Sequence, residues 1–246
     1  MMLTMIKILL ITWLVGIHAL TLLAIWDTDL PYRIDRKLNL GLLNPPEITR
    51  FYEDMLGSHL QLDGSVEEGS VIFLGDSLTQ GLNVAAISNQ SINYGIGMDT
   101  TAGLLKRITT YESLEKASII VIAIGINDLI RVKRKPENIL ENYQKILESL
   151  PQPSNKRSTV FIQALLPVDE SASSLSGIND KILQLNSSLQ SLATAYGAEF
   201  INLHASFAES TGNLKQTLHI GDGLHLRSEG YHLWISALKL KLEQQY

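Results

Sequence analysis

The stretch Val71-Ile72-Phe73-Leu74-Gly75-Asp76-Ser77-Leu78 decides the fold expected for this chain of 246 residues. Its four consecutive apolar residues indicate a strand buried on both faces, which is typical of a parallel sheet covered by helices. The Gly-Asp-Ser turn that follows places a serine hydroxyl at the carboxyl end of that strand, where open α/β sheets bind their ligands. We therefore expect Ser77 to lie at the functional edge of a sheet.

Strand and helix patterns alternate along the rest of the chain, as they do in α/β folds. Strands are predicted at 70–74, 90–94, 118–124, 159–165 and 198–202, and helices at 47–60, 78–87, 100–109, 136–150, 177–196 and 228–244. Continuous apolar strands such as 119–124 indicate a mainly parallel sheet of five strands with helices on both faces. Motifs that follow these strands should meet at one edge.

The segment Asp222-Gly223-Leu224-His225 supplies the two groups that a reactive serine needs. A serine hydroxyl is a poor nucleophile unless a base lies within hydrogen-bond reach and a carboxylate orients that base. Asp222 can hold Nδ1–H of His225 while Nε2 faces Ser77. His219 is a rival base, but no Asp lies three residues before it. The order Ser, Asp, His occurs in known triads, whereas the missing Gly-x-Ser-x-Gly motif argues against the ordinary α/β-hydrolase fold.

Two further motifs, NYGIGMDTT at 93–101 and Gly125-Ile126-Asn127-Asp128, could stabilise a developing oxyanion. Acyl transfer needs hydrogen-bond donors at that oxygen, and a side-chain amide with backbone N–H groups can provide them. Asn127 is the amide of choice. Asp76 and Asp128 are expected to accept from nearby backbone N–H groups in their own turns.

In this order, GDSL at 75–78, NYGIGMDTT, GIND at 125–128 and DGLH resemble the blocks of the SGNH/GDSL hydrolases. The resemblance covers roughly Gly69 to the C-terminus and agrees with the strand pattern on a flavodoxin-like, three-layer α/β/α sandwich. It implies that Ser77 is the nucleophile, His225 the general base and then acid, and Asp222 the group that orients the imidazole. The oxyanion hole would comprise the Ser77 N–H, a backbone N–H of the second block and the Asn127 side chain. No metal or organic cofactor is implied.

The second block departs from the family pattern at Met98. Family members commonly read Gly-Ile-Ser-Gly-Asp-Thr or Gly-Ile-Gly-Gly-Asp-Thr, and the last glycine donates its N–H. Alignment on Asp99-Thr100 places Met98 at that glycine. A positive φ is costly for methionine. Either Met98 donates from an ordinary conformation, or the loop shifts and Gly97 takes its place.

The implied activity is hydrolysis of carboxylic esters through an acyl-enzyme, on lipid esters such as lysophospholipids or on acetylated carbohydrates. Two alternatives stay open: an O-acyltransferase on the same fold and a non-catalytic, membrane-anchored binding module. A metallophosphoesterase is disfavoured because Gly-Asn-His-Asp, His-x-His and His-Glu-x-x-His motifs are missing. A formal net charge of −5 disfavours nucleic acid as a partner, and without cysteines there is no disulfide framework. Oligomeric state is not indicated.

The first 26 residues differ in composition from the rest. The run 8–26 carries no formal charge, and as a helix it would measure about 28 Å, close to the hydrocarbon thickness of a bilayer. No small-x-small cleavage site ends it. We expect residues 1–26 to form an uncleaved transmembrane anchor, 27–46 a linker and 47–246 the hydrolase domain.

The orientation of this anchor follows from the distribution of Lys and Arg. Lys7 and the amino terminus favour an N-inside arrangement, whereas Arg33, Arg36 and Lys37 favour the opposite one. Because the N-terminal tail is short, we expect a single-pass protein whose domain lies outside the cytoplasmic membrane, in the periplasm or at the cell surface.

Overall fold

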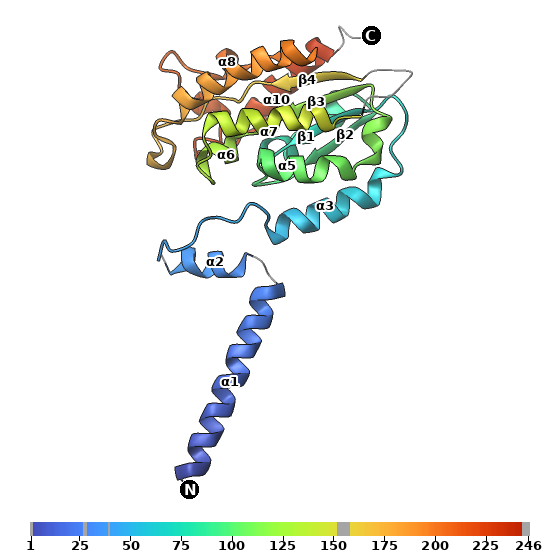
Figure 1. The fold of residues 1–246 in the computed structure, drawn as a ribbon. Helices are drawn as coiled ribbons and strands as arrows, with labels where there is room; N and C mark the ends of the chain where they lie inside the picture. Colours follow the sequence, from blue (N-terminus) through green and yellow to red (C-terminus); the bar gives the residue numbers. More distant parts are fainter. Residues whose placement is uncertain (1, 27–28, 39, 152–157, 243–246) are drawn as a thin grey trace.

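A computed structural model describes residues 2–26, 29–38, 40–151 and 158–242. Its centre is one parallel sheet in the order β2-β1-β3-β4-β5. The strands are β1 (Val71–Gly75), β2 (Ser91–Gly95), β3 (Ile119–Ala123), β4 (Thr159–Gln163) and β5 (Glu199–Ile201). The five predicted strands and their parallel arrangement are confirmed (Figure 1).

The order of the strands reverses at β1, which lies between β2 and β3. At the carboxyl edge, Gly75 pairs with Gly95 on one side and with Ala123 on the other. A reversal of this kind leaves a crevice at the carboxyl ends of the strands, where α/β folds bind ligands. The loops after β1, β2 and β3, which carry the first three motifs, therefore leave the sheet side by side.

Helices cover both faces of the sheet and make the three-layer sandwich that was predicted. They are α3 (Arg50–Asp63), α4 (Ser77–Gln80), α5 (Thr101–Arg107), α6 (Ile126–Ile130), α7 (Pro136–Ser149), α8 (Ile178–Tyr196), α9 (His204–Phe207) and α10 (Ser228–Leu242). The helix predicted at 78–87 is only the short α4 and a 3-10 turn at Val84–Ala86. Positions 243 and 244 of the last predicted helix lie outside the described residues.

Alternate side chains of each strand enter two different hydrophobic cores. Ile72 and Leu74 of β1 belong to the core shared with α5, α7 and α8. Val71 and Phe73 belong to the opposite core, which contains Trp234 of α10. Burial on both faces accounts for the continuous apolar runs and holds the carboxyl edge of the sheet rigid.

The N-terminal helix α1 (Met2–Trp26) extends away from the sandwich (Figure 1). Its segment Thr4–Leu23 has a mean hydropathy of 2.1 and none of it is buried, so by length and composition it is able to cross a membrane. The segment predicted as a linker contains a second helix, α2 (Leu30–Lys37), which begins with a proline in its first turn. Residues 27, 28 and 39 of that segment lie outside the described residues.

Candidate active site

Ser77, His225 and Asp222 form a hydrogen-bonded chain at the carboxyl edge of the sheet. Ser77 Oγ lies 3.1 Å from Nε2 of His225, although the two residues are 148 positions apart in the sequence. The other imidazole nitrogen, Nδ1, lies 2.6 Å from Oδ2 of Asp222. These distances fall within hydrogen-bond range, and the arrangement is that of a serine, a base and an orienting carboxylate.

The loop conformation of Asp222 explains how it holds this position. Its Oδ1 accepts hydrogen bonds from the backbone N–H groups of Leu224 at 3.0 Å and His225 at 2.9 Å. Partial burial raises the pKa of Asp222, but the hydrogen bonds from the His225 imidazole and from these two N–H groups outweigh that effect. The net pKa lies below the usual range. Asp222 is therefore ionised at neutral pH.

The turn after β1 presents Ser77 at the start of α4. Asp76 caps this helix by accepting the Leu78 N–H at 3.0 Å, as predicted for its own turn. A Cβ at Gly75 would lie 2.0 Å from Thr79 Oγ1 and 2.4 Å from the carbonyl of Ala123, so only glycine permits this close packing. Burial raises the pKa of Asp76 to about 7, and the charges of Asp99 and Asp128 raise it less strongly.

His219 supports the loop that carries Asp222 and His225. Its Nδ1 accepts the backbone N–H groups of Gly221 and Gly223, each at 3.1 Å, on both sides of Asp222. An accepting Nδ1 leaves the ring proton on Nε2, which faces Asp169 Oδ2 at 3.4 Å. The sequence raised His219 only as a rival base; in the structure it is buried and holds the loop.

The second block adopts a conformation that neither sequence-based alternative described. Met98 has a φ of 65°, so it does not take an ordinary conformation. The Gly97 N–H donates to Gln80 Oε1 at 2.7 Å and is already engaged. The N–H of Met98 forms no hydrogen bond with any described residue. Asn127 is buried, and its Nδ2 donates to the Asp99 carbonyl at 3.0 Å, which leaves its second N–H for another acceptor.

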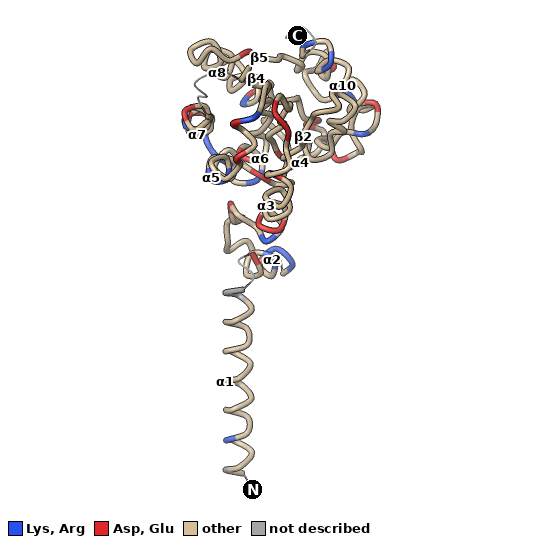
Figure 2. Tube along the Cα trace, turned by 90° about the vertical axis from the view of Figure 1, so that its right-hand side faces the viewer, with Lys and Arg blue, Asp and Glu red and all other residues tan. Residues whose placement is uncertain are grey.

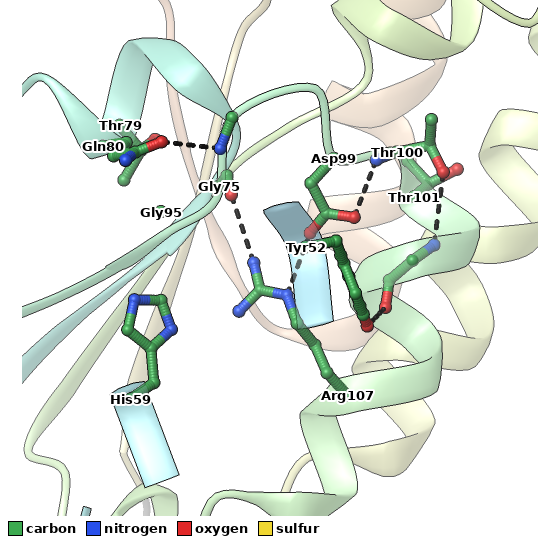
Figure 3. A network of polar contacts seen from close by, with 12 residues as sticks. Tyr52, His59, Gly75, Thr79, Gln80, Gly95, Asp99, Thr100, Thr101 and Arg107 are labelled. Carbon is green, nitrogen blue, oxygen red and sulfur yellow. Dashed lines mark hydrogen bonds and ion pairs between the residues drawn. The ribbon is translucent and has the colours of Figure 1, made fainter. Parts of the chain in front are cut away.

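A buried ion pair that the sequence did not reveal connects these loops (Figure 3). Arg107 donates through Nε to Asp99 at 2.9 Å, and both side chains are fully buried. It also donates to the Gly75 carbonyl at 3.1 Å and to the Tyr111 hydroxyl at 2.8 Å. Burial raises the pKa of Asp99 to about 6, although Arg107 lowers it. Arg107 thereby fixes the end of β1 relative to the second block.

Asp128 connects two helices instead of capping its own turn, so the prediction for this residue was wrong. The Asp128 carboxylate accepts hydrogen bonds from the backbone N–H of Thr101 at 2.8 Å and from the Thr101 hydroxyl at 2.6 Å. It also forms an ion pair with Arg134. Arg134 also pairs with Glu47 at 3.0 Å. The interactions of Asp128 extend 27 positions along the chain, from α6 to α5.

A small pocket lies behind this edge, with a volume of about 20 Å³ and a mostly apolar lining that includes Leu78, Leu224, Gln163 and Trp234. A space of this size holds about one water molecule and no acyl chain. Trp234 closes it by donating to Gln163 at 2.5 Å. Over the described part of the chain, no group of three or more His, Asp or Glu side chains is arranged to hold a metal ion.

Comparisons with known proteins identify the family. Residues 73–233 match the model of the GDSL-like Lipase/Acylhydrolase family. A Streptococcus pneumonia protein described as a platelet activating factor is 26% identical, with a TM-score of 0.71 over 78% of this chain and 93% of that one. A GDSL-like lipase from Bacteroides thetaiotaomicron is 18% identical, with a TM-score of 0.68 over 80% of this chain and 100% of the other.

A lipase/acylhydrolase from Enterococcus faecalis has the same fold at 21% identity, with a TM-score of 0.61 over 72% of this chain and 96% of that one. No protein in the comparison with curated proteins matched. The family model spans more than half of the chain and includes the turn that carries Ser77, the Asn127 helix and the Asp222–His225 loop. The chain therefore belongs to the GDSL-like lipase/acylhydrolase family.

Proposed function

We propose that the chain is a serine hydrolase that cleaves carboxylic esters through an acyl-enzyme, with Ser77, His225 and Asp222 as its catalytic triad. The observation that carries this proposal is the continuous contact from Ser77 Oγ to His225 Nε2 and from His225 Nδ1 to Asp222. Membership of an acylhydrolase family supports it.

In the acylation step, His225 Nε2 removes the proton of Ser77 as Oγ forms a bond to the ester carbonyl carbon. The ionised carboxylate of Asp222 stabilises the resulting imidazolium. When the tetrahedral intermediate collapses, the bond to the alcohol oxygen breaks and His225 transfers the proton to that leaving alcohol. The acyl group remains on Ser77.

In deacylation, His225 takes a proton from water while the water oxygen attacks the acyl carbon. The bond to Ser77 Oγ then breaks, the carboxylic acid leaves, and His225 returns the proton to the serine. The chemistry needs no metal or organic cofactor. Both steps develop negative charge on the same carbonyl oxygen, so one set of donors serves both.

The donors we propose for that oxygen are the backbone N–H groups of Ser77 and Met98 and the free N–H of the Asn127 amide. Met98 is favoured over Gly97 because Gln80 already accepts the Gly97 N–H at 2.7 Å. The left-handed conformation of Met98 retains the backbone donor that a glycine supplies in other members. An N–H held in a strained conformation is a feature of functional sites.

We further propose that α1 anchors the enzyme as a single-pass helix, with the domain outside the cytoplasmic membrane and lipid or acetylated glycan esters within reach. The chain has no cysteine, so a Lys239→Cys variant provides one exposed thiol on the domain. Labelling of intact cells by a membrane-impermeant maleimide is expected. Labelling only after lysis would place the domain inside.

The test of the esterase compares hydrolysis of p-nitrophenyl acetate and butyrate by the full chain in dodecyl maltoside with that by Ser77→Ala. Ser187→Ala, at an exposed position of α8, is the matched control. We expect chelator-resistant turnover and fluorophosphonate labelling that disappear only in Ser77→Ala. Equal turnover in Ser77→Ala would refute the triad, and absent turnover and labelling in the natural chain would favour a binding module.

Product analysis with added alcohol or sugar acceptors completes that test. An esterase releases the acyl group as the free acid, and adding the acceptor does not change that product. Transfer of most acyl groups to the acceptor would instead identify an O-acyltransferase that uses the same acyl-enzyme.

A further inference from the structure

A cavity of about 490 Å³ lies between α2 and the loop that follows α6. Arg36 and Tyr32 contribute from α2, and Arg131 and Lys133 contribute from the loop. Its volume is in the range of small-molecule sites. The two walls are about 100 positions apart in the sequence, so the fold brings together two basic segments that are distant along the chain.

Two of the three cations that line this cavity, Arg36 and Lys133, are available to meet an anion. Arg36 and Lys133 are exposed, and neither forms an ion pair with another residue in the described ranges. Lys133 has a φ of 53°, an uncommon conformation for a non-glycine residue. The one acidic side chain of the lining, Asp35, has an Oδ1 that accepts the Leu42 N–H at 2.9 Å. Positive charge therefore dominates the cavity.

Arg131 makes the wall rigid. Its two terminal nitrogens donate to the carbonyls of Pro46 at 2.6 Å and Glu47 at 3.1 Å, which fastens the segment after α2 to the catalytic domain. Its Nε is buried and has no hydrogen-bond partner among the described residues. The backbone N–H of Arg131 donates to the carbonyl of Asn127 at 3.0 Å. The cavity is thus a fixed neighbour of the proposed oxyanion donor.

The segment beside the cavity also carries an exposed apolar surface. Ile34 and Leu38 are 45% and 62% exposed, and Leu42 is 77% exposed. Arg33, Arg36 and Lys37 of α2 lie close to Ile34 and Leu38 in the sequence, and a short segment with both basic and exposed apolar residues suits a membrane interface. Figure 2 shows α2 between α1 and the rest of the protein. The chain from 26 to 30 extends at most about 14 Å, so a membrane-spanning α1 would keep α2 at the bilayer surface.

We infer that this cavity binds the phosphate of an anionic membrane lipid headgroup, while the exposed apolar residues of 34–42 enter the interface. This inference rests on the proposed membrane anchor. The bound lipid is a docking ligand, and it would hold the catalytic edge at the bilayer surface, within reach of esters in the membrane.

Lipid binding to the full chain tests this inference. Native mass spectrometry from dodecyl maltoside, with titration of dioleoylphosphatidylglycerol, gives the dissociation constant. We expect Arg36→Gln/Lys133→Gln to weaken phosphatidylglycerol binding about thirtyfold, because each cation near a lipid surface contributes a factor of about five. Lys181→Gln/Lys239→Gln removes two exposed cations from other helices and should leave the constant unchanged.

Hydrogen–deuterium exchange in nanodiscs locates the bound lipid and separates its sources. We expect protection of 30–38 and 130–134 when phosphatidylglycerol is added to phosphatidylcholine discs, and loss of that protection in the Arg36/Lys133 double variant. Three results would each overturn the inference: equal protection in pure phosphatidylcholine discs, protection by inorganic phosphate alone, or the same protection in the double variant as in the natural chain. Co-elution of the protein with the discs tests the membrane anchor, and turnover that depends on Ser77 tests the esterase. A negative result in either measurement can therefore be told apart from a negative result for lipid binding in the cavity.

Discussion

Replacement of His219 tests whether the loop of Asp222 and His225 depends on a second imidazole. In His219→Leu, the N–H groups of Gly221 and Gly223 lose the acceptor that each reaches at 3.1 Å. His219→Asn retains a carbonyl oxygen close to the position of Nδ1. His219→Gln instead places its amide near Nε2. The three variants therefore differ in whether the two N–H groups retain a partner.

The magnitude follows from the burial of those two donors. Gly221 is exposed, so water can replace its lost acceptor, whereas Gly223 is buried and its N–H would stay unpaired. An unpaired buried N–H costs about 1–3 kcal/mol. If the loop opens to satisfy it, the population with Asp222 and His225 in place falls by about tenfold to a hundredfold.

The assay is steady-state hydrolysis of p-nitrophenyl acetate by the full chain in detergent, with guanidinium unfolding as a check on folding. We expect kcat to fall about tenfold to a hundredfold in His219→Leu and His219→Gln with little change in KM, and to recover to within about threefold in His219→Asn. His232→Leu, at an exposed histidine, is the control. A folded His219→Leu with nearly full kcat, or a His219→Asn as impaired as His219→Leu, would refute this reasoning.

Three further predictions concern residues that lie near the site. Arg107→Met should lower the free energy of unfolding by about 3–5 kcal/mol at pH 8, because it leaves the buried Asp99 carboxylate without a positively charged partner. Arg107→Met/Asp99→Asn should recover part of this loss. Burial raises the pKa of Asp76 to about 7, so the folded state retains a proton that the unfolded chain releases near pH 4. The stability that this group contributes is therefore complete below pH 4 and declines by at most about 4 kcal/mol as the pH rises to 7. The Asp76→Asn variant still caps α4, and in urea unfolding it should show a smaller decline over this pH range. Met98→Gly should retain kcat for p-nitrophenyl acetate within about threefold, whereas Met98→Val should lower it at least tenfold, because a β-branched residue resists a positive φ.

Each of these has a distinct contrary result. An Arg107→Met protein as stable as the natural chain would mean that the ion pair contributes nothing. An unchanged pH dependence in Asp76→Asn would mean that Asp76 is ionised throughout. A fully active Met98→Val would mean that the left-handed N–H is not used.

Local patterns were sufficient to predict the sheet and to name three side chains that the structure brings together at its carboxyl edge. Each strand is a short apolar run, and the motif around Ser77 ends the most buried of them. Asp222 and His225 are three residues apart, so one short loop decides their geometry. These features depend on neighbours in the sequence, which is why they could be predicted without coordinates.

The supporting contacts depend on residues far apart in the chain. Arg107 lies in a helix whose sequence looks half-exposed, yet it reaches a carbonyl 32 positions earlier. Met98 takes a positive φ because the surrounding loop over-determines its conformation, against the preference of its own side chain. The segment that contains α2 was expected to be a linker because it has prolines and a glycine. The residues after α2 are held by Arg131, which lies 85 positions from its acceptor Pro46, and no local pattern indicates such a contact.

The distance along the chain between Ser77 and His225 has a consequence for biosynthesis. All five strands precede His225 in the sequence, so the whole sheet is synthesised before the base of the proposed triad. A fragment from a message cut short before codon 222 would contain Ser77 and every strand, but it would lack both His225 and α10, whose Trp234 belongs to one of the two cores. Such a product would have no proton acceptor for the proposed cleavage of esters. The order of the elements thus makes the proposed ester cleavage depend on a segment that is translated after the whole sheet.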